Sequence, residues 1–396
     1  MAVETKIAVA PAKPPVWNDP RYRALFFQVL VLGGVVLLGA YLVSNTMANL
    51  ERQGIASGFG FLETTAGFSI SQTLVEYSEE SSYGRAFLVG LLNTMLVSII
   101  GIFFATILGF IIGVARLSRN WLISNLAAVY IEILRNIPLL LQIFFWYFAV
   151  LRNVPSPKNS HSLFDSFFLN IRGLYSPAPV FEAGFWLILV ALVAGIVGVV
   201  VLARWARVRQ ERTGERFPVF FTSLGILIGL PLLAAIVTGF PLSWNYPELK
   251  GFNFVGGMVV IPELVALALA LSTYTASFIA EIVRAGITAV SHGQTEAAYS
   301  LGLRAGPTLR LVVIPQALRV IIPPLTSQYL NLMKNSSLAA AIAYPDIVLV
   351  FAGTVLMQTG QAVEIISITM AVYLTLSLLI SAFMNWYNKK MALVER

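Results

Sequence analysis

Long apolar stretches alternate with short polar segments along this chain, and eight of them are long enough to cross a membrane. The hydrocarbon core of a bilayer is about 30 Å thick, so a spanning helix needs about 20 mostly apolar residues. The expected spans lie approximately at residues 25–48, 86–115, 122–151, 183–203, 218–240, 261–287, 309–334 and 363–387. The pattern therefore predicts an all-α, polytopic membrane protein with about eight transmembrane helices.

The seventh span is the least regular, because it contains three prolines. Pro315, Pro323 and Pro324 each lack a backbone N–H and are expected to interrupt the helix. Inside a bilayer, interrupted backbone is tolerated only where protein or a water-filled cavity satisfies the freed polar groups. The polar stretch from Lys334 to Tyr344 is therefore a candidate for a partly re-entrant segment.

Composition agrees with the membrane class. Hydrophobic residues make up 58% of the chain and charged residues only 11%, whereas soluble domains carry about 25% charged residues. The formal net charge of +7 comes from bases placed between apolar segments, not from a basic run interleaved with aromatic residues. The sequence therefore predicts contact with membrane lipid and no binding to nucleic acid.

The loop charges predict an orientation with both termini in the cytoplasm, since short loops rich in Lys and Arg stay on that side. The loops that would then be external hold fewer bases and more acids. The bases of the cytoplasmic segments are Lys6, Lys13, Arg21, Arg23, Arg116, Arg119, Arg204, Arg207, Arg209, Arg212, Arg216, Arg304, Lys389, Lys390 and Arg396.

Several kinds of chemistry lack the residues that they need. The chain has no cysteine, its two histidines (His161 and His292) lie far apart in sequence, and it contains no HExxH motif or phosphate-binding loop. No metal site, no catalytic residue and no cofactor are therefore expected in this chain. This argues against a membrane-embedded enzyme, and it means that the energy for any uphill transport must come from a partner or an ion gradient.

One cytoplasmic loop, between the sixth and seventh spans, has the pattern of a short helix. Thr295 is the expected N-cap and Gly302 the expected end. Ala297 and Leu301, four residues apart, would share one face, and Glu296 would be free to meet a cation. From these residues alone, the helix either lies on the membrane surface or fits into a groove of another protein.

The spacing in this loop resembles the EAA loop of ABC-type import permeases. That pattern is Glu-Ala-Ala, three residues, Gly, nine residues and then Ile-x-Leu-Pro. The matching positions here are Glu296, Ala297, Ala298, Gly302, Val312, Ile314 and Pro315, with two conservative replacements at Val312 and Ile314. The resemblance implies a coupling helix that docks on a partner ATPase, which binds ATP and Mg²⁺ and performs the hydrolysis.

Three further segments resemble the polar amino acid permeases within that group, and especially the general L-amino acid permease subunits. They are 131–142 (a Glu-x-x-Arg-x-x-Pro-Leu-Leu-x-Gln pattern), 280–286 and 331–338. The resemblance implies uptake of L-amino acids across the bacterial inner membrane. It also implies three kinds of partner: a second homologous permease, an ABC ATPase dimer and a periplasmic amino acid-binding protein.

The resemblance covers a five-helix permease core, and the remaining segments are additions to it. The expected parts are a cytoplasmic tail (1–24), an extra transmembrane helix (25–48), a periplasmic loop (49–85), the first core part (86–151), an insertion with two helices (152–260), the second core part with the coupling loop at 291–315 (261–388) and a cytoplasmic tail (389–396).

Charged residues inside the spans form two pairs at i, i+3 spacing. Glu132 with Arg135 and Glu281 with Arg284 are expected to be structural or gating charges, as is Lys334. Direct contact with substrate is the alternative for the two pairs, and a position at the membrane interface is the alternative for Lys334.

Polar residues nearer the middle of the spans are candidates for the substrate pathway, because an amino acid zwitterion needs both donors and acceptors. Hydrogen bonds between helices are the alternative for each of them. The candidates are Asn93, Thr94, Gln142, Thr273, Tyr274, Ser277, Gln328 and Asn331.

The rival transport hypothesis is a secondary amino acid transporter driven by an ion gradient. Such a protein needs acidic residues deep in its helices to couple protons or sodium ions. Acidic residues of that kind are scarce here.

Overall fold

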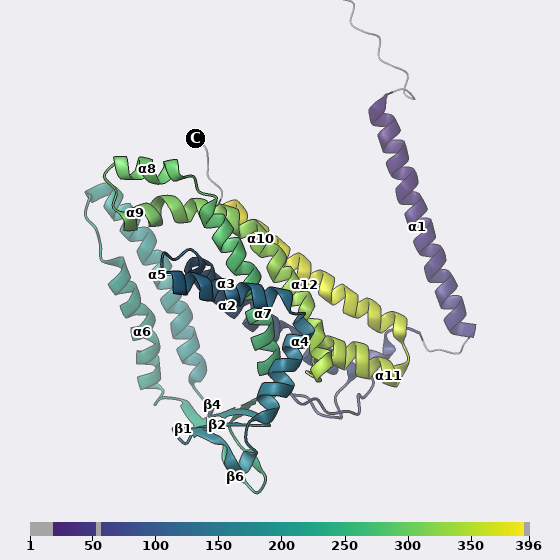
Figure 1. The fold of residues 1–396 in the computed structure, drawn as a ribbon. Helices are drawn as coiled ribbons and strands as arrows, with labels where there is room; N and C mark the ends of the chain where they lie inside the picture. The colour runs from purple at the N-terminus through teal and green to yellow at the C-terminus, as the bar shows by residue number, and fades with distance from the viewer. Residues whose placement is uncertain (1–18, 53–56, 392–396) are drawn as a thin grey trace, which may run out of the picture. The chain divides into compact units, whose positions relative to one another are not determined.

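The computed structural model describes residues 19–52 and 57–391, and most of them are helical (Figure 1). Within those residues, seven helices are long and apolar enough to span a membrane, and a bent pair of helices brings the number to eight. The structure therefore confirms the prediction of a polytopic helical membrane protein. Its long helices are α1 (Pro20–Arg52), α2 (Tyr83–Arg116), α5 (Phe185–Thr213), α6 (Val219–Val237), α7 (Pro262–Thr288), α10 (Ile314–Asn335) and α12 (Ala362–Met391).

The predicted terminal tails lie largely outside the described residues, at 1–18 and 392–396. The first helix starts at Pro20, within the range expected for the tail, and every described side chain of it is exposed. A proline suits the first turn of a helix, because the N–H that it lacks has no intrahelical acceptor there. The last helix continues to Met391, three residues into the predicted C-terminal tail.

The third predicted span is broken. Helices α3 (Trp121–Asn136) and α4 (Leu139–Phe144) belong to two runs bent by 105°, the second of which continues to Asn153. Between them Ile137 is extended (φ −93°, ψ 127°) and Pro138 follows. A residue before proline is driven out of the helical region by the proline ring. The span expected over 122–151 is therefore not one straight helix, and it counts as the eighth span only where the bent pair is taken as one.

The prolines of the seventh span do not break it. α10 runs through Pro323 and Pro324, both on exposed positions, and Pro315 lies in its first turn. A π-helical turn at Leu309–Val313 and the short helix α9 (Ala305–Thr308) precede α10. The expected interruption was wrong, because the helical run continues from residue 305 to 342.

The stretch predicted to be partly re-entrant follows α10 directly. It begins as a 3₁₀ segment (Ser336–Ile342) that ends at Ala343, which has a positive φ of 59°. A π-helical segment (Val348–Val355) and α11 (Leu356–Thr359) come next and form a short apolar helix that the sequence did not indicate. Re-entry into a membrane stays a prediction.

The chain divides into two compact units, of which the smaller combines the described residues up to Gly90 with Ile347–Thr375. Two hydrogen bonds join its halves. The Gly58 N–H donates to Glu364 Oε1 (2.6 Å), and the Tyr83 hydroxyl donates to Gln358 Oε1 (3.0 Å). A 3₁₀ turn (Gly60–Glu63) places Phe61 in a stacked contact with Phe351.

The larger unit, residues 91–346 and 376–396, is built around α7. Glycines let the neighbouring helices approach closely. A Cβ built on Gly109 of α2 would lie 2.5 Å from Ile279 Cγ2, and one on Gly113 would lie 2.7 Å from the Ala280 carbonyl oxygen. On the other side, a Cβ on Gly286 would lie 2.3 Å from Ile321 Cγ1 of α10. Close packing on small residues is a usual way for membrane helices to associate.

The insertion contains short strands in residues 152–182 and 241–260, the two segments between its helices and the core that were expected to be external loops. Its strands are β1 (His161–Leu163), β2 (Phe167–Asn170), β3 (Gly173–Ser176), β4 (Ala178–Phe181), β5 (Leu242–Asn245), β6 (Glu248–Lys250), β7 (Asn253–Val255) and β8 (Met258–Val260). One sheet has the order β1-β2-β3-β8, and β4–β5 and β6–β7 are separate pairs. Strands from both ends of the insertion therefore pair with each other. Helices α5 and α6 lie between these strands in the sequence and form a helical hairpin.

Candidate functional site

The cytoplasmic-loop helix predicted from the sequence is α8 (His292–Ser300). It begins four residues earlier than expected, after Ser291, and no side chain caps its first turn. The assignment of Thr295 as N-cap was therefore wrong, because Thr295 lies inside the helix. Its expected end at Gly302 agrees with the structure, in which Leu301 is the C-cap.

The end of α8 is a Schellman motif that requires glycine. The Gly302 N–H donates to the Tyr299 carbonyl (2.9 Å), and the Leu303 N–H donates to the Ala298 carbonyl (3.1 Å). Gly302 has φ +80°, a left-handed conformation that residues with a Cβ adopt at a cost. The glycine thus fixes the direction in which the chain leaves α8.

α8 turns one small residue inward and presents the others to solvent. Ala298 is 4% exposed, whereas Glu296 and Ala297 are exposed. Large apolar side chains are also exposed beside them, and of these the sequence indicated only Leu301, on the face of Ala297. They are Tyr299, Leu301, Leu309 and Leu311. Leu301 is 83% exposed, and its spacing four residues after Ala297 is the sequence feature that indicated it. Exposed apolar groups rimmed by charge are typical of a docking surface.

The loop is fixed to the start of the following helix. The Gln316 amide nitrogen lies 3.2 Å from Gln294 Oε1 and donates to it. Thr308 of α9 is buried, and its hydroxyl has no hydrogen-bond partner among the described residues. Pro315 is half-buried in the first turn of α10. One exposed hydrogen bond thus joins α8 to the first turn of α10.

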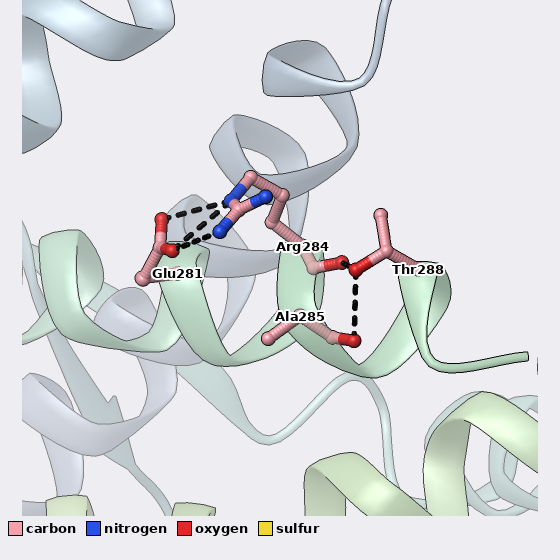
Figure 2. Close-up of polar contacts among 4 residues, drawn as sticks. All are labelled: Glu281, Arg284, Ala285 and Thr288. Carbon is pink, nitrogen blue, oxygen red and sulfur yellow. Dashed lines mark hydrogen bonds and ion pairs between the residues drawn. The ribbon is translucent and has the colours of Figure 1, made fainter.

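Glu281 and Arg284 form an ion pair on α7, as Figure 2 shows. The Arg284 Nε lies 3.0 and 3.1 Å from the two carboxylate oxygens, and Nη2 makes a further contact with Oε1. One turn later the Thr288 hydroxyl donates to the carbonyls of Arg284 (2.9 Å) and Ala285 (3.0 Å). About a third of each charged side chain is exposed.

The other expected pair, Glu132 with Arg135, is not formed in the described part of the chain. The Glu132 carboxylate accepts a hydrogen bond from Asn136 Nδ2 (3.3 Å) instead. The guanidinium of Arg135 lies over the Phe278 ring of α7, 5.2 Å from its centroid. That position directs Arg135 away from its own helix and toward α7, where a cation is attracted by the aromatic face.

Gln142 stabilises the break between α3 and α4. Its Nε2 donates to the carbonyls of Leu134 and Ile137, both at 2.9 Å. These carbonyls belong to the end of α3, which the break deprives of helical partners. The Gln142 side chain is buried, and its Oε1 has no hydrogen-bond partner within the described residues.

The other pathway candidates divide between three places. Asn93 and Thr94 are fully buried in α2, and Asn93 Nδ2 donates to the Pro345 carbonyl (2.9 Å). On α7, Ser277 is buried and its hydroxyl donates to the Tyr274 carbonyl, while the Thr273 carbonyl accepts from the Tyr130 hydroxyl. Three residues lie along α10, with Gln328 half-buried and both Asn331 and Lys334 exposed.

Metal ligands do not gather anywhere in the described residues, where no group of three or more His, Cys, Asp or Glu side chains lies together. The arrangement instead offers an exposed loop connected to a buried helix. α8 is hydrogen-bonded to α10, and α10 packs on α7. α7 carries the Glu281–Arg284 ion pair and three of the candidates for the substrate pathway.

Comparison with known proteins places this architecture in a family. Residues 254–393, which include α7, α8 and α10, match the family model described as binding-protein-dependent transport system inner membrane component. The permease protein YhdX of Escherichia coli (strain K12) is 58% identical over 96% of both chains. The chain belongs to the amino-acid ABC transporter permeases. This permease therefore works in ATP-driven transport, and the hypothesis of a secondary transporter driven by an ion gradient is not favoured.

Two other relatives of this permease also match it over almost their full lengths. The general L-amino acid transport system permease protein AapQ of Rhizobium johnstonii is 56% identical, covering 96% of this chain and 94% of AapQ. The glutamate/glutamine/aspartate/asparagine transport system permease protein BztB of Rhodobacter capsulatus is 44% identical over 96% of both chains. These relatives thus match the insertion as well as the five-helix core.

Proposed function

We propose that this permease imports a broad set of L-amino acids through the bacterial inner membrane, with both termini in the cytoplasm. Its similarity to AapQ and BztB, whose names specify general L-amino acids and acidic amino acids with their amides, supports this substrate class. The bases of the loops support the orientation. The chain itself makes and breaks no bonds, and transport is driven from outside it.

The proposed complex contains a second, related permease, two ABC ATPase subunits and a periplasmic amino acid-binding protein. ATP and Mg²⁺ bind to the ATPase subunits. The family description, a component of binding-protein-dependent transport, supports the binding protein as a partner. The exposed apolar residues of the α8 loop support a protein partner on the cytoplasmic side.

The observation that carries the proposal is the exposed α8 joined to α10 and, through Gly286, to α7. In this mechanism the ATPase contacts Glu296, Ala297 and Leu301 and displaces α8 when it closes on ATP. Gly302 keeps the end of α8 in one geometry, so the displacement reaches α10. Because α7 and α10 are in close contact at Gly286, the movement continues into the helix that carries Glu281 and Arg284.

The proposed pathway follows the face that α7 shares with α3. Thr273, Tyr274 and Ser277 are its nearest polar side chains, and Arg135 and Arg284 supply cations for a carboxylate. Gln142 contributes through its unpartnered Oε1, an acceptor for an ammonium group. Asn93, Thr94, Gln328 and Asn331 remain proposed pathway residues on α2 and α10, and Lys334 a proposed gating charge.

The test is charge reversal in α8 within the complete, reconstituted transporter. Glu296→Lys places a cation in the docking surface, and we expect ATP-driven uptake into proteoliposomes to fall by about tenfold or more. Glu211→Lys is the matched control, because Glu211 is also an exposed acid on a cytoplasmic helix end. Equal uptake by both variants, with the ATPase still bound, would show that α8 is not the coupling element.

A further inference from the structure

An apolar groove lies on the larger unit between α2, α10 and α12, outside the pathway described above. Its first part has a volume of about 380 Å³ and extends from Met95 and Leu376 to Met384. Its second part, of about 310 Å³, continues to Leu318 and Tyr387. Tyr329, Phe383 and Met384 line both parts, so the two parts adjoin, and together they are called the groove.

The dimensions of the groove suit an extended hydrocarbon chain. Along α2 it runs from Met95 to Phe110, which corresponds to about 22 Å at the rise of an α-helix. One leaflet of the hydrocarbon core is about half of 30 Å thick, so a lipid tail of ordinary length fits along it. Its wall is apolar except for four hydroxyls, and two of these, Thr106 and Tyr329, bond to each other (2.9 Å).

The end of the groove at Tyr387 is cationic. Arg319, next to Leu318 of the wall, donates from Nε to the Met391 carbonyl at the end of α12 (3.3 Å). Lys389 and Lys390 are exposed there, and the Lys390 ammonium lies 5.4 Å from the centre of the Trp386 ring. Aromatic residues beside lysines mark the level of lipid headgroups.

No acidic residue offsets these cations on the parts of α2, α10 and α12 that line the groove. Residues 91–116, 305–335 and 376–391 contain no Asp or Glu at all. The apolar groove thus ends at Tyr387, one helical turn before Lys389 and Lys390, and Arg319 bonds to the end of the same helix. An anionic phospholipid complements this distribution of charge.

We propose that this groove binds one anionic phospholipid, with an acyl chain along α2 and the phosphate at Arg319, Lys389 and Lys390. The lipid covers the apolar wall that the chain leaves open at Ile99 and Phe383, which are 62% and 60% exposed. The charges favour this occupant over a second permease. An apolar protein surface would fill the groove equally well, but it would leave the three cations without counter-charges.

The experiment measures lipid retained by the full transporter complex after equilibration in detergent with equal amounts of labelled phosphatidylglycerol and phosphatidylcholine. Wild-type protein should retain phosphatidylglycerol in preference. Lys389→Gln with Lys390→Gln should lower that preference by about tenfold. Arg204→Gln with Arg207→Gln removes two exposed cations from α5 and is the control that should leave the preference unchanged.

A second variant tests the groove itself. Ile99→Trp places a large ring in the open wall and should abolish retention, whereas Ile111→Trp, on a similarly exposed position of α2 outside the groove, should not. Equal retention by these two variants, or an unchanged preference after loss of the two lysines, would overturn the proposal. Loss of the second permease from Ile99→Trp complexes would also overturn it, since the groove would then be a subunit interface.

Discussion

Helices α6 and α7 are both long enough to cross a membrane, yet the protein surrounds them very differently. None of the apolar window of α6 is buried, and only 6% of that of its neighbour α5, whereas 56% of the window of α7 is buried. α6 contains no charged residue, while α7 contains Glu263, Glu281 and Arg284. The more apolar helix is therefore the one that the protein leaves uncovered.

This difference reverses the rule for soluble proteins and follows from the solvent. Lipid tails are as apolar as leucine, so burying an apolar membrane helix against protein brings no hydrophobic gain. Association depends on close packing and polar contacts instead. α7 has small residues on its buried side, including Ala270, Ala276 and Ala280, and Gly109 and Gly113 of α2 approach it there.

The largest expected effect comes from filling one of these close contacts. Gly109→Leu would force a side chain into the space of Ile279, so we expect a loss of about 3 kcal/mol or more of stability and little correctly assembled transporter. Thermal unfolding and size-exclusion chromatography of the detergent-solubilised complex measure both effects.

The matched control is on the uncovered helix. Gly229→Leu in α6 meets no atom within 4 Å, so it should change stability by less than about 0.5 kcal/mol. If both leucines were equally harmful, α6 would be covered by a partner, and its exposed surface would not be a lipid-facing one.

Hydrophobic runs were sufficient to find the spans, because length and apolar composition are local properties. They could not show which spans pack together, because that depends on contacts such as Gly286 with Ile321 that lie far apart in sequence. The strands of the insertion were missed for a similar reason. They have only three or four residues each, and β3 pairs with β8 across α5 and α6.

The effect of the prolines was predicted at the wrong place. The helix was expected to break at Pro323 and Pro324, but it continues there, and the break lies at Pro138 instead. At Pro138 the carbonyls that lose their helical partners accept hydrogen bonds from Gln142, so the break leaves these polar groups paired. The α8 loop was predicted more fully, since Gly302 and the spacing of Glu296 before it are sequence features. The exposure of Leu309 and Leu311 became apparent only in three dimensions.

An intermediate effect is expected from removing the amide that stabilises the break. Gln142→Leu keeps the size of the side chain but leaves the carbonyls of Leu134 and Ile137 without their donor, at a cost of about 1–3 kcal/mol. We expect a lower midpoint of thermal unfolding and a lower rate of uptake by the reconstituted transporter.

Gln210→Leu near the C-terminal end of α5 is the corresponding control in the hairpin. Gln210 is exposed, so its loss should leave both measurements close to wild type. An unchanged Gln142→Leu protein would mean that Pro138 alone maintains the bend, and the interpretation of Gln142 as its stabiliser would fail.

The smallest effect on stability, and the sharpest contrast in function, should come from two ion pairs. Glu281→Gln breaks the pair with Arg284 in the core, and Glu215→Gln breaks the pair with Arg209 at the end of the hairpin (2.8 Å). Both pairs are partly exposed, so each change should cost less than about 1 kcal/mol of unfolding free energy.

The rate of uptake should distinguish the two variants, because only Glu281 orients an arginine beside the proposed pathway. Initial rates of ATP-driven uptake should therefore fall for Glu281→Gln alone. A similar loss for Glu215→Gln would mean that the hairpin takes part in transport, and the division between a working core and a lipid-facing addition would not hold.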